Sequence, residues 1–182
     1  IYGTIQISVY GLMFFLPSQV ASLMGESLGF KQSLVAAIPW ACSAFGVYYI
    51  PRIADRNPSR RVAISVMCML AAAVGLALSA FAGPVVAIGA LCLSAVGFLS
   101  VQPIFWTFPP QLLTGPALAA GIGFCTTMGA FCSFLAPLIR VEVDRAMDSS
   151  IAGLMALSVI TIGCALLIGL LQKSQQAAKA YS

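Results

Sequence analysis

Residues 62–82 read VAISVMCMLAAAVGLALSAFA, an apolar run without a charged side chain. Roughly 20 such residues in a helix cross the hydrocarbon core of a bilayer, which is about 30 Å thick. The run shows no alternation of polar and apolar residues, so it predicts a helix and not a strand of a membrane barrel. A helix also satisfies its own backbone hydrogen bonds in lipid. The stretch therefore predicts a transmembrane helix.

Five further runs of similar character lie on either side of this stretch. Hydrophobic residues make up 60% of the 182 residues and charged residues only 8%, which is too little polar surface for a water-soluble domain. We therefore predict an all-α membrane protein, with one bundle of six transmembrane helices over residues 1–172 and a polar cytoplasmic tail over residues 173–182. The predicted spans cover about residues 2–24, 34–51, 62–82, 84–108, 116–139 and 150–171.

Positive charges gather on one side of the predicted bundle. The connection over residues 52–61 contains four arginines and one aspartate, and six of the nine Lys and Arg residues lie in connections on the side of the C-terminal tail. By the positive-inside rule this side faces the cytoplasm. We expect a multi-pass protein of a cell (inner) membrane with both ends in the cytoplasm. This topology explains the net charge of +4, so we expect no nucleic-acid partner.

The sequence opens at Ile1, inside the first apolar run, without a basic leader or a small-residue cleavage site. These features predict that no signal peptide is present. We expect the sequence to be part of a longer protein.

The abundance of cysteine suggests metal or redox chemistry, but the spacing argues against it. The six cysteines lie inside predicted spans without a C-x-x-C pair, and the chain contains no histidine. Zinc sites and thiol exchange need closely spaced ligands that water can reach, and a Ser–His hydrolase needs the missing base. We expect no enzyme activity, no metal site and no cofactor. The cysteines are expected to act as small hydrophobic side chains.

Polar and aromatic side chains inside the spans indicate a substrate path. An amide at membrane depth is stable only where it faces protein or water, so Gln6 and Gln102 are expected to point inward. Two alternatives to a substrate contact stay open. In the first, Trp106 is an interfacial anchor. In the second, Thr126 and Thr127 bond only the carbonyls of their own helix. The substrate-contacting residues that we predict are Gln6, Tyr10, Phe14, Trp40, Gln102, Trp106, Thr126 and Thr127.

Small residues and prolines predict where the helices touch and bend. Prolines fall inside four spans, at Pro17, Pro39, Pro103 and Pro137, and each removes a backbone donor. A row of small residues four positions apart predicts a helix-packing face on the span 116–139. Such a row suits helices that slide against each other and equally a static bundle. Its members are Gly121, Cys125, Gly129 and Ser133.

No carboxylate, histidine, lysine or arginine is expected at membrane depth. The acidic residues all fall in predicted connections, and we expect no buried Lys or Arg that could pair with an anion. A proton carrier would then lie outside these 182 residues. The five acids are Glu26, Asp55, Glu142, Asp144 and Asp148.

Three stretches resemble, in order and spacing, the C-terminal half of a major facilitator superfamily transporter. FFLPSQVASL at 14–23 is similar to span seven of its anion:cation symporter branch, and QPIFWTFPPQLLTGPALAAGIGF at 102–124 is similar to spans ten and eleven. FKQSLVAAIPWACSAFGVYYIPRIADRNPSRR at 30–61 resembles span eight with its loop. The pattern D-R-x-x-x-R-R resembles the cytoplasmic gate motif of the superfamily, and its charged residues are Asp55, Arg56, Arg60 and Arg61.

The resemblance implies the C-terminal half of a secondary active transporter that imports small organic anions together with protons by alternating access. Such anions are sugar acids, dicarboxylates or aromatic acids. The substrate site would lie between this unit and an N-terminal six-helix half that is absent from this chain, and the gate charges would pair across the cytoplasmic helix ends. Two alternatives stay open. In the first, residues 52–61 are a topology anchor without a gating role. In the second, the chain is a stand-alone six-span protein that acts as a homodimer or scaffold.

One stretch departs from the branch. Its eleventh span usually reads G-I-A-x-I-N-S-x-G-N, whereas Thr126 stands here at the first Asn and Ala130 at the second. A threonine offers one hydroxyl where an asparagine offers a carbonyl and two amide protons. We therefore expect a less polar substrate, such as an aromatic acid.

Overall fold

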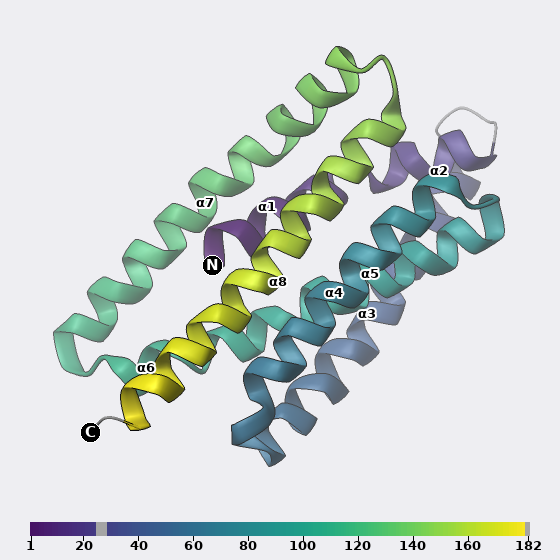
Figure 1. Cartoon of the computed structure of the whole chain (residues 1–182). Coiled ribbons are helices and arrows are strands. Elements are labelled where there is room, and N and C mark those ends of the chain that lie inside the picture. Colours follow the sequence, from purple (N-terminus) through teal and green to yellow (C-terminus); the bar gives the residue numbers. More distant parts are fainter. Residues whose placement is uncertain (25–28, 181–182) are drawn as a thin grey trace.

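The structure is a computed structural model, which describes residues 1–24 and 29–180 of the chain. In this part of the chain every regular element is a helix and no strand occurs (Figure 1). Glu26, which the sequence places in a connection, lies outside the described residues. The elements are α1 (Tyr2–Met13), α2 (Leu16–Met24), α3 (Phe30–Arg56), the short 3-10 helix η1 (Pro58–Arg60), α4 (Arg61–Phe81), α5 (Pro84–Trp106), α6 (Pro109–Leu112), α7 (Gly115–Ala146) and α8 (Ser150–Ala180).

Five of these helices are long and apolar enough to cross a membrane, namely α3, α4, α5, α7 and α8. The pair of α1 and α2 makes a sixth candidate if both count as one span, with a bend of 41° between them. This arrangement confirms the predicted all-α membrane fold. Helix α8 continues through the predicted polar tail as far as Ala180, and the side of the membrane on which it ends stays a prediction.

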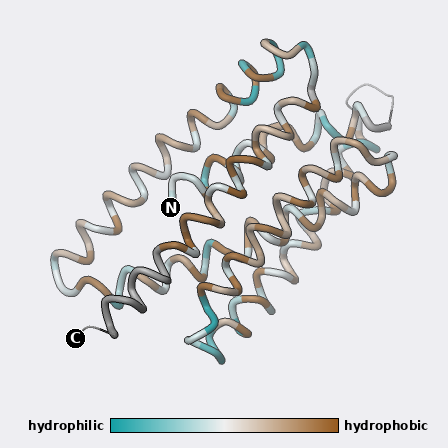
Figure 2. Tube along the Cα trace, viewed as in Figure 1, coloured by the Kyte–Doolittle hydropathy of each residue, from teal (hydrophilic) through white to brown (hydrophobic). Residues whose placement is uncertain are grey.

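The long helices lie side by side and alternate in direction (Figure 1). Helix α4 packs between α5 and α8, α3 packs on the other side of α5, and α1 packs against α7 and α8. Brown apolar segments fill the middle of the helices, and teal polar residues gather where α3 meets α4 and where α7 meets α8 (Figure 2). The core contains fully buried side chains from five helices, among them Ile5, Met69, Phe98 and Leu157.

Small residues allow α4 and α5 to approach each other closely. A Cβ atom on Gly75 would lie 2.5 Å from the carbonyl oxygen of Ala90, and one on Gly97 would lie 2.9 Å from the Cβ of Ala72. The Ser94 hydroxyl donates a hydrogen bond to the carbonyl of Ala72 across this contact, at 3.0 Å. Close backbone approach of this kind is how helices associate in lipid.

The predicted prolines differ in their effect on the helices. Pro17 stands second in α2, directly after the break in the first span, where a residue without an N–H is tolerated. Pro39, Pro103 and Pro137 lie inside continuous helices. The first span is therefore the one that the structure divides into two helices.

Candidate functional site

Two side-chain amides from distant parts of the chain meet inside the bundle. The Nε2 atom of Gln102, on α5, donates a hydrogen bond of 3.1 Å to the Oε1 atom of Gln6, on α1. The Gln6 side chain is buried and that of Gln102 is half-buried. A glutamine has two N–H donors and one carbonyl oxygen, so the amide nitrogen of Gln6 and the carbonyl oxygen of Gln102 keep unused capacity toward the described residues.

An aromatic cluster lies one helical turn from this amide pair. The ring of Tyr2 stacks on Phe105 with 5.0 Å between centroids, and it meets Trp106 edge to face at 4.9 Å. Both arrangements are favoured for aromatic pairs. Tyr2 precedes Gln6 by four residues and Trp106 follows Gln102 by four, so the helical period places the cluster and the amides on the same helix faces. The structure thus places Trp106 in a side-chain cluster between α1 and α5.

Tyr10 lies one helical turn beyond Gln6 on α1, and Phe14 is the residue that follows the end of this helix. Their ring centroids are 6.0 Å apart. Both rings line a hollow of about 220 Å³ between α1 and α7. Its remaining lining residues come from α7 and are Ser133, Phe134, Pro137 and Leu138.

The other predicted substrate residues lie apart from these contacts. Trp40, on α3, is half-buried and packs against the hydrophobic core. Thr126 donates to the carbonyls of Ile122 and Gly123, and Thr127 donates to the carbonyl of Gly123, each at 2.9 Å. Both threonine side chains are exposed on α7. Both hydroxyl groups therefore donate within their own helix, which is the alternative to a substrate contact given above for these two residues.

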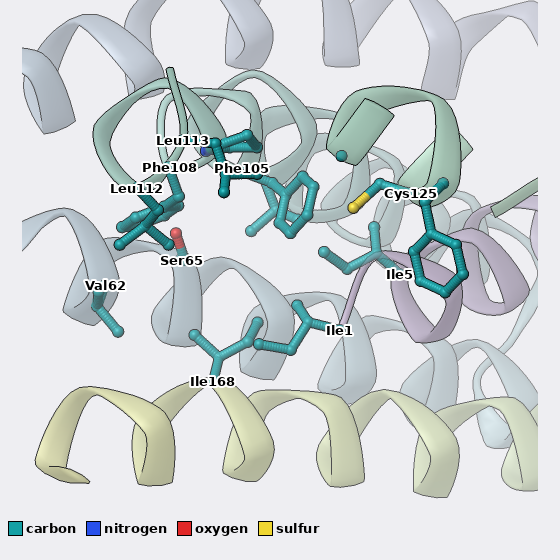
Figure 3. A pocket seen from close by; sticks show the side chains of 14 residues that line it. Ile1, Ile5, Val62, Ser65, Phe105, Phe108, Leu112, Leu113, Cys125 and Ile168 are labelled. Atoms are coloured by element: carbon teal, nitrogen blue, oxygen red, sulfur yellow. The ribbon is translucent and has the colours of Figure 1, made fainter. Parts of the chain in front are cut away.

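A larger apolar cavity of about 490 Å³ lies at the end of the bundle near α6. Ile1, Ile5 and Ile168 point into it (Figure 3). The Ser65 hydroxyl and the Cys125 thiol also belong to its lining. None of the predicted substrate residues lines it. The wall is almost wholly apolar, and the Ser65 hydroxyl already donates to the carbonyl of Arg61, so this cavity is poorly suited to orient an anion.

The predicted small-residue row lies partly against α1. At Gly129 a Cβ atom would collide with the ring of Tyr2 and would lie 3.3 Å from the Cγ of Gln6. Of the others, Cys125 lines the 490 Å³ cavity and Ser133 the smaller hollow, while Gly121 lies against Leu113. The close approach at Gly129 is what places Gln6 beside α7.

The charged residues 52–61 join the end of α3 to the start of α4. Arg61 and Asp55 form an ion pair of 3.0 Å, in which the Asp55 side chain is 58% exposed. Arg56 and Arg60 are exposed. An ion pair with an exposed partner contributes little to folding stability, about 0–1 kcal/mol. Folding stability therefore does not explain why the pair is present.

The structure corrects one prediction: a buried arginine does lie in the bundle. The side chain of Arg140, on α7, is only 2% exposed. Its Nη1 atom donates to the carbonyl of Gly11 at 3.2 Å and its Nη2 atom to Oε1 of Gln19 at 3.0 Å. Its Nε atom faces a carboxylate oxygen of Asp144 at 3.7 Å. The expectation of no buried Lys or Arg is therefore wrong.

The error has a plain cause. The run of charges from residue 140 on predicts a connection, but α7 continues through it to Ala146, so that Glu142 and Asp144 are helical. The spacing of four residues between Arg140 and Asp144 was a usable signal, because oppositely charged residues at this spacing face each other on a helix. Asp148 lies just beyond the helix, with φ of 47°.

Fold and buried groups together define the class of protein. The chain is a multi-span membrane protein of transmembrane helices, with an amide pair and a guanidinium inside the bundle. No protein-family model matches the chain, and no solved structure matches it significantly.

Curated bacterial transport proteins are similar to the chain. It is 48% identical to "Inner membrane transport protein RhmT" of Escherichia coli (strain K12) over 98% of the chain and 42% of that protein. It is 29% identical to a "Quinolone resistance transporter" of Acinetobacter baumannii, over 88% of the chain and 37% of the relative. A "Putative tartrate transporter" of Agrobacterium vitis is also 29% identical, over 95% of the chain and 38% of the relative. The chain spans about two fifths of the length of these relatives.

Proposed function

We propose that the chain is the C-terminal half of a secondary active transporter of the inner membrane, which imports small organic anions with protons by alternating access. The hydrogen bond between Gln102 and Gln6 carries the proposal. Two amides buried in a membrane bundle are costly unless they serve a polar ligand or each other, and each keeps a group free for a ligand. The transporter names of the relatives, and the part of their length that the chain matches, support the same function.

The substrate that we propose has a carboxylate and a flat or compact body. The free Gln6 amide nitrogen would donate to the carboxylate, and Tyr10 and Phe14 would contact the body of the anion in the hollow beside α7. One relative is named for tartrate, a dicarboxylate, and another for resistance to quinolones, which are aromatic compounds. Aromatic side chains and threonines in place of amides favour an aromatic acid over a more polar one.

We propose that an N-terminal six-helix half packs against α3 and α7. In the most apolar window of α7 only 11% of the residues are buried inside this bundle, and in that of α3 only 17%. Helices with so little buried surface are suited to contact a second bundle as well as lipid. This second half would carry the proton site, and the charged residues 52–61 would lie in the cytoplasm as they do in the predicted topology.

Asp55 and Arg61 are proposed to act in the cytoplasmic gate. Their ion pair spans the turn from α3 to α4, so a change in the relative position of these two helices would strain or break it. Asp55→Asn in the longer protein is expected to slow anion uptake while membrane insertion stays intact, measured by uptake rate against protein content of the membrane. Unchanged uptake would reduce residues 52–61 to a topology anchor.

The amide pair is tested by replacing Gln102. The longer protein is reconstituted in liposomes, and uptake of radiolabelled tartrate and benzoate is followed under an imposed proton gradient. Gln102→Leu removes the bond to Gln6 and leaves a buried amide unpaired, so uptake is expected to fall at least about tenfold. Gln111→Leu is the matched control, because Gln111 is exposed on α6 and bonds only the carbonyl of Thr107. Equal uptake by both variants would refute the assignment of the amides.

A further inference from the structure

The first span breaks between α1 and α2, and the break leaves a backbone carbonyl without its helical partner. In a continuous helix the N–H of Phe15 would bond the carbonyl of Gly11. Here it bonds the carbonyl of Leu12 instead, at 3.2 Å. Two residues on, Pro17 has no N–H to offer to the preceding turn. The bend of 41° follows from these two local features.

Arg140 fills the gap that the break leaves. Its Nη1 atom donates to the carbonyl of Gly11, at the end of α1, and its Nη2 atom to the side chain of Gln19, on α2. The guanidinium carbon lies 4.2 Å from the ring centroid of Phe15, at the break itself. One side chain of α7 thus contacts the first span before, at and after its bend.

The same cluster extends to α8. One carboxylate oxygen of Asp144 faces Arg140 Nε at 3.7 Å, and the other accepts a hydrogen bond of 2.8 Å from the N–H of Gly153 in the first turns of α8. A Cβ atom on Gly153 would collide with the Asp144 carboxylate and lie 2.9 Å from Arg140 Cγ. Only glycine at position 153 allows α8 to come this close to α7. The cluster around Arg140 therefore includes groups from α1, α2, α7 and α8.

A buried guanidinium is stable only while it is paired. Loss of one partner leaves charge and donors without compensation in a medium of low dielectric, so such clusters hold together or open as a unit. Arginine suits this position better than lysine, because its planar group donates in two directions at once.

We propose that Arg140 is a positioning residue that latches α2 to α7 and α8, and that its release lets α2 move about the break. The latch lies at the end of the bundle where α7 turns into α8, opposite residues 52–61 (Figure 1). Release of α2 opens this end of the molecule. The gating role rests on the proposed transport function, whereas the latch itself does not.

Hydrogen–deuterium exchange of the longer protein in lipid nanodiscs tests the latch without any substrate. Arg140→Gln removes both hydrogen bonds to the first span, and exchange in residues 11–22 is expected to become about tenfold faster. Gln19→Ala removes only the contact with α2 and leaves the buried charge in place, so it tests the latch even if Arg140→Gln fails to fold. It is expected to raise exchange in residues 16–22. Arg145→Gln is the control, because Arg145 is an exposed arginine five positions further along α7.

The expected result is faster exchange confined to the first span, with α4 and α5 as protected as before and with no effect of Arg145→Gln. Unchanged exchange in residues 11–22, or an equal rise in all helices, would overturn the latch. For the gating role, uptake of tartrate and benzoate by Gln19→Ala is expected to change in maximal rate more than in KM. Faster local exchange with an unaltered maximal rate would overturn the gating role alone.

Discussion

The absence of a side chain at Gly129 decides how close Gln6 comes to its neighbours. Gly129 has no side chain, and this allows α1 to rest on α7 with Tyr2 and the Gln6 stem against the glycine backbone. Gln6 in turn meets Gln102 on α5. The position of the amide pair thus depends on a glycine that binds nothing itself.

A side chain at Gly129 is predicted to disrupt this arrangement. Gly129→Val would force Tyr2 and Gln6 away from α7, with an expected loss of about 1–3 kcal/mol of unfolding free energy from overpacking and a marked loss of anion uptake. Gly123→Val is the matched control, because no atom lies within 4 Å of a Cβ built at this exposed glycine of the same helix. Thermal unfolding in detergent and uptake in liposomes measure both effects. If the two variants unfold and transport alike, Gly129 does not set the position of α1.

Composition predicts the helices well, because a segment in lipid must be both apolar and long enough to span. Among the described residues, five helices are long and apolar enough to cross a membrane, and α1 with α2 makes a sixth candidate if both count as one span. Composition fails where the fold satisfies a polar group inside the bundle. The charges of Arg140 and Asp144 predict a connection, although both residues lie on α7 and are stabilised there by partners on α1, α2 and α8. The inward orientation of Gln6 was predictable from cost alone, but its pairing with Gln102 was not, since 96 residues separate the two amides.

The contact between α4 and α5 gives a prediction at the scale of the helix pair. Gly75→Ala should lower the unfolding free energy by about 1–3 kcal/mol, although alanine favours a helix by about 1 kcal/mol over glycine. The reason is that the added methyl group meets the Ala90 carbonyl across the interface. On α5, Gly89→Ala meets open space and should leave stability unchanged or slightly higher. Thermal unfolding of both variants checks this, and a neutral Gly75→Ala would show that α4 and α5 can separate without cost.

On the scale of the whole molecule, the helices differ in how much of their surface is buried inside the bundle. Helices α4, α5 and α8 bury their contacts with one another, whereas α3 and α7 are left with most of their surface outside the bundle. The amide pair lies on α1 and α5, between these two exposed helices in the order of packing. We propose that the second half of the transporter covers α3 and α7 and completes the anion site.

The most direct test of this account compares the 182-residue chain with the longer protein in liposomes. Uptake of a radiolabelled organic anion is measured under an imposed proton gradient, with equal amounts of inserted protein. We predict that the longer protein accumulates the anion and that the chain alone does not, because a single six-helix half would lack the proton site and one side of the substrate site. Accumulation by the chain alone would contradict the account, and so would a longer protein that accumulates no organic anion.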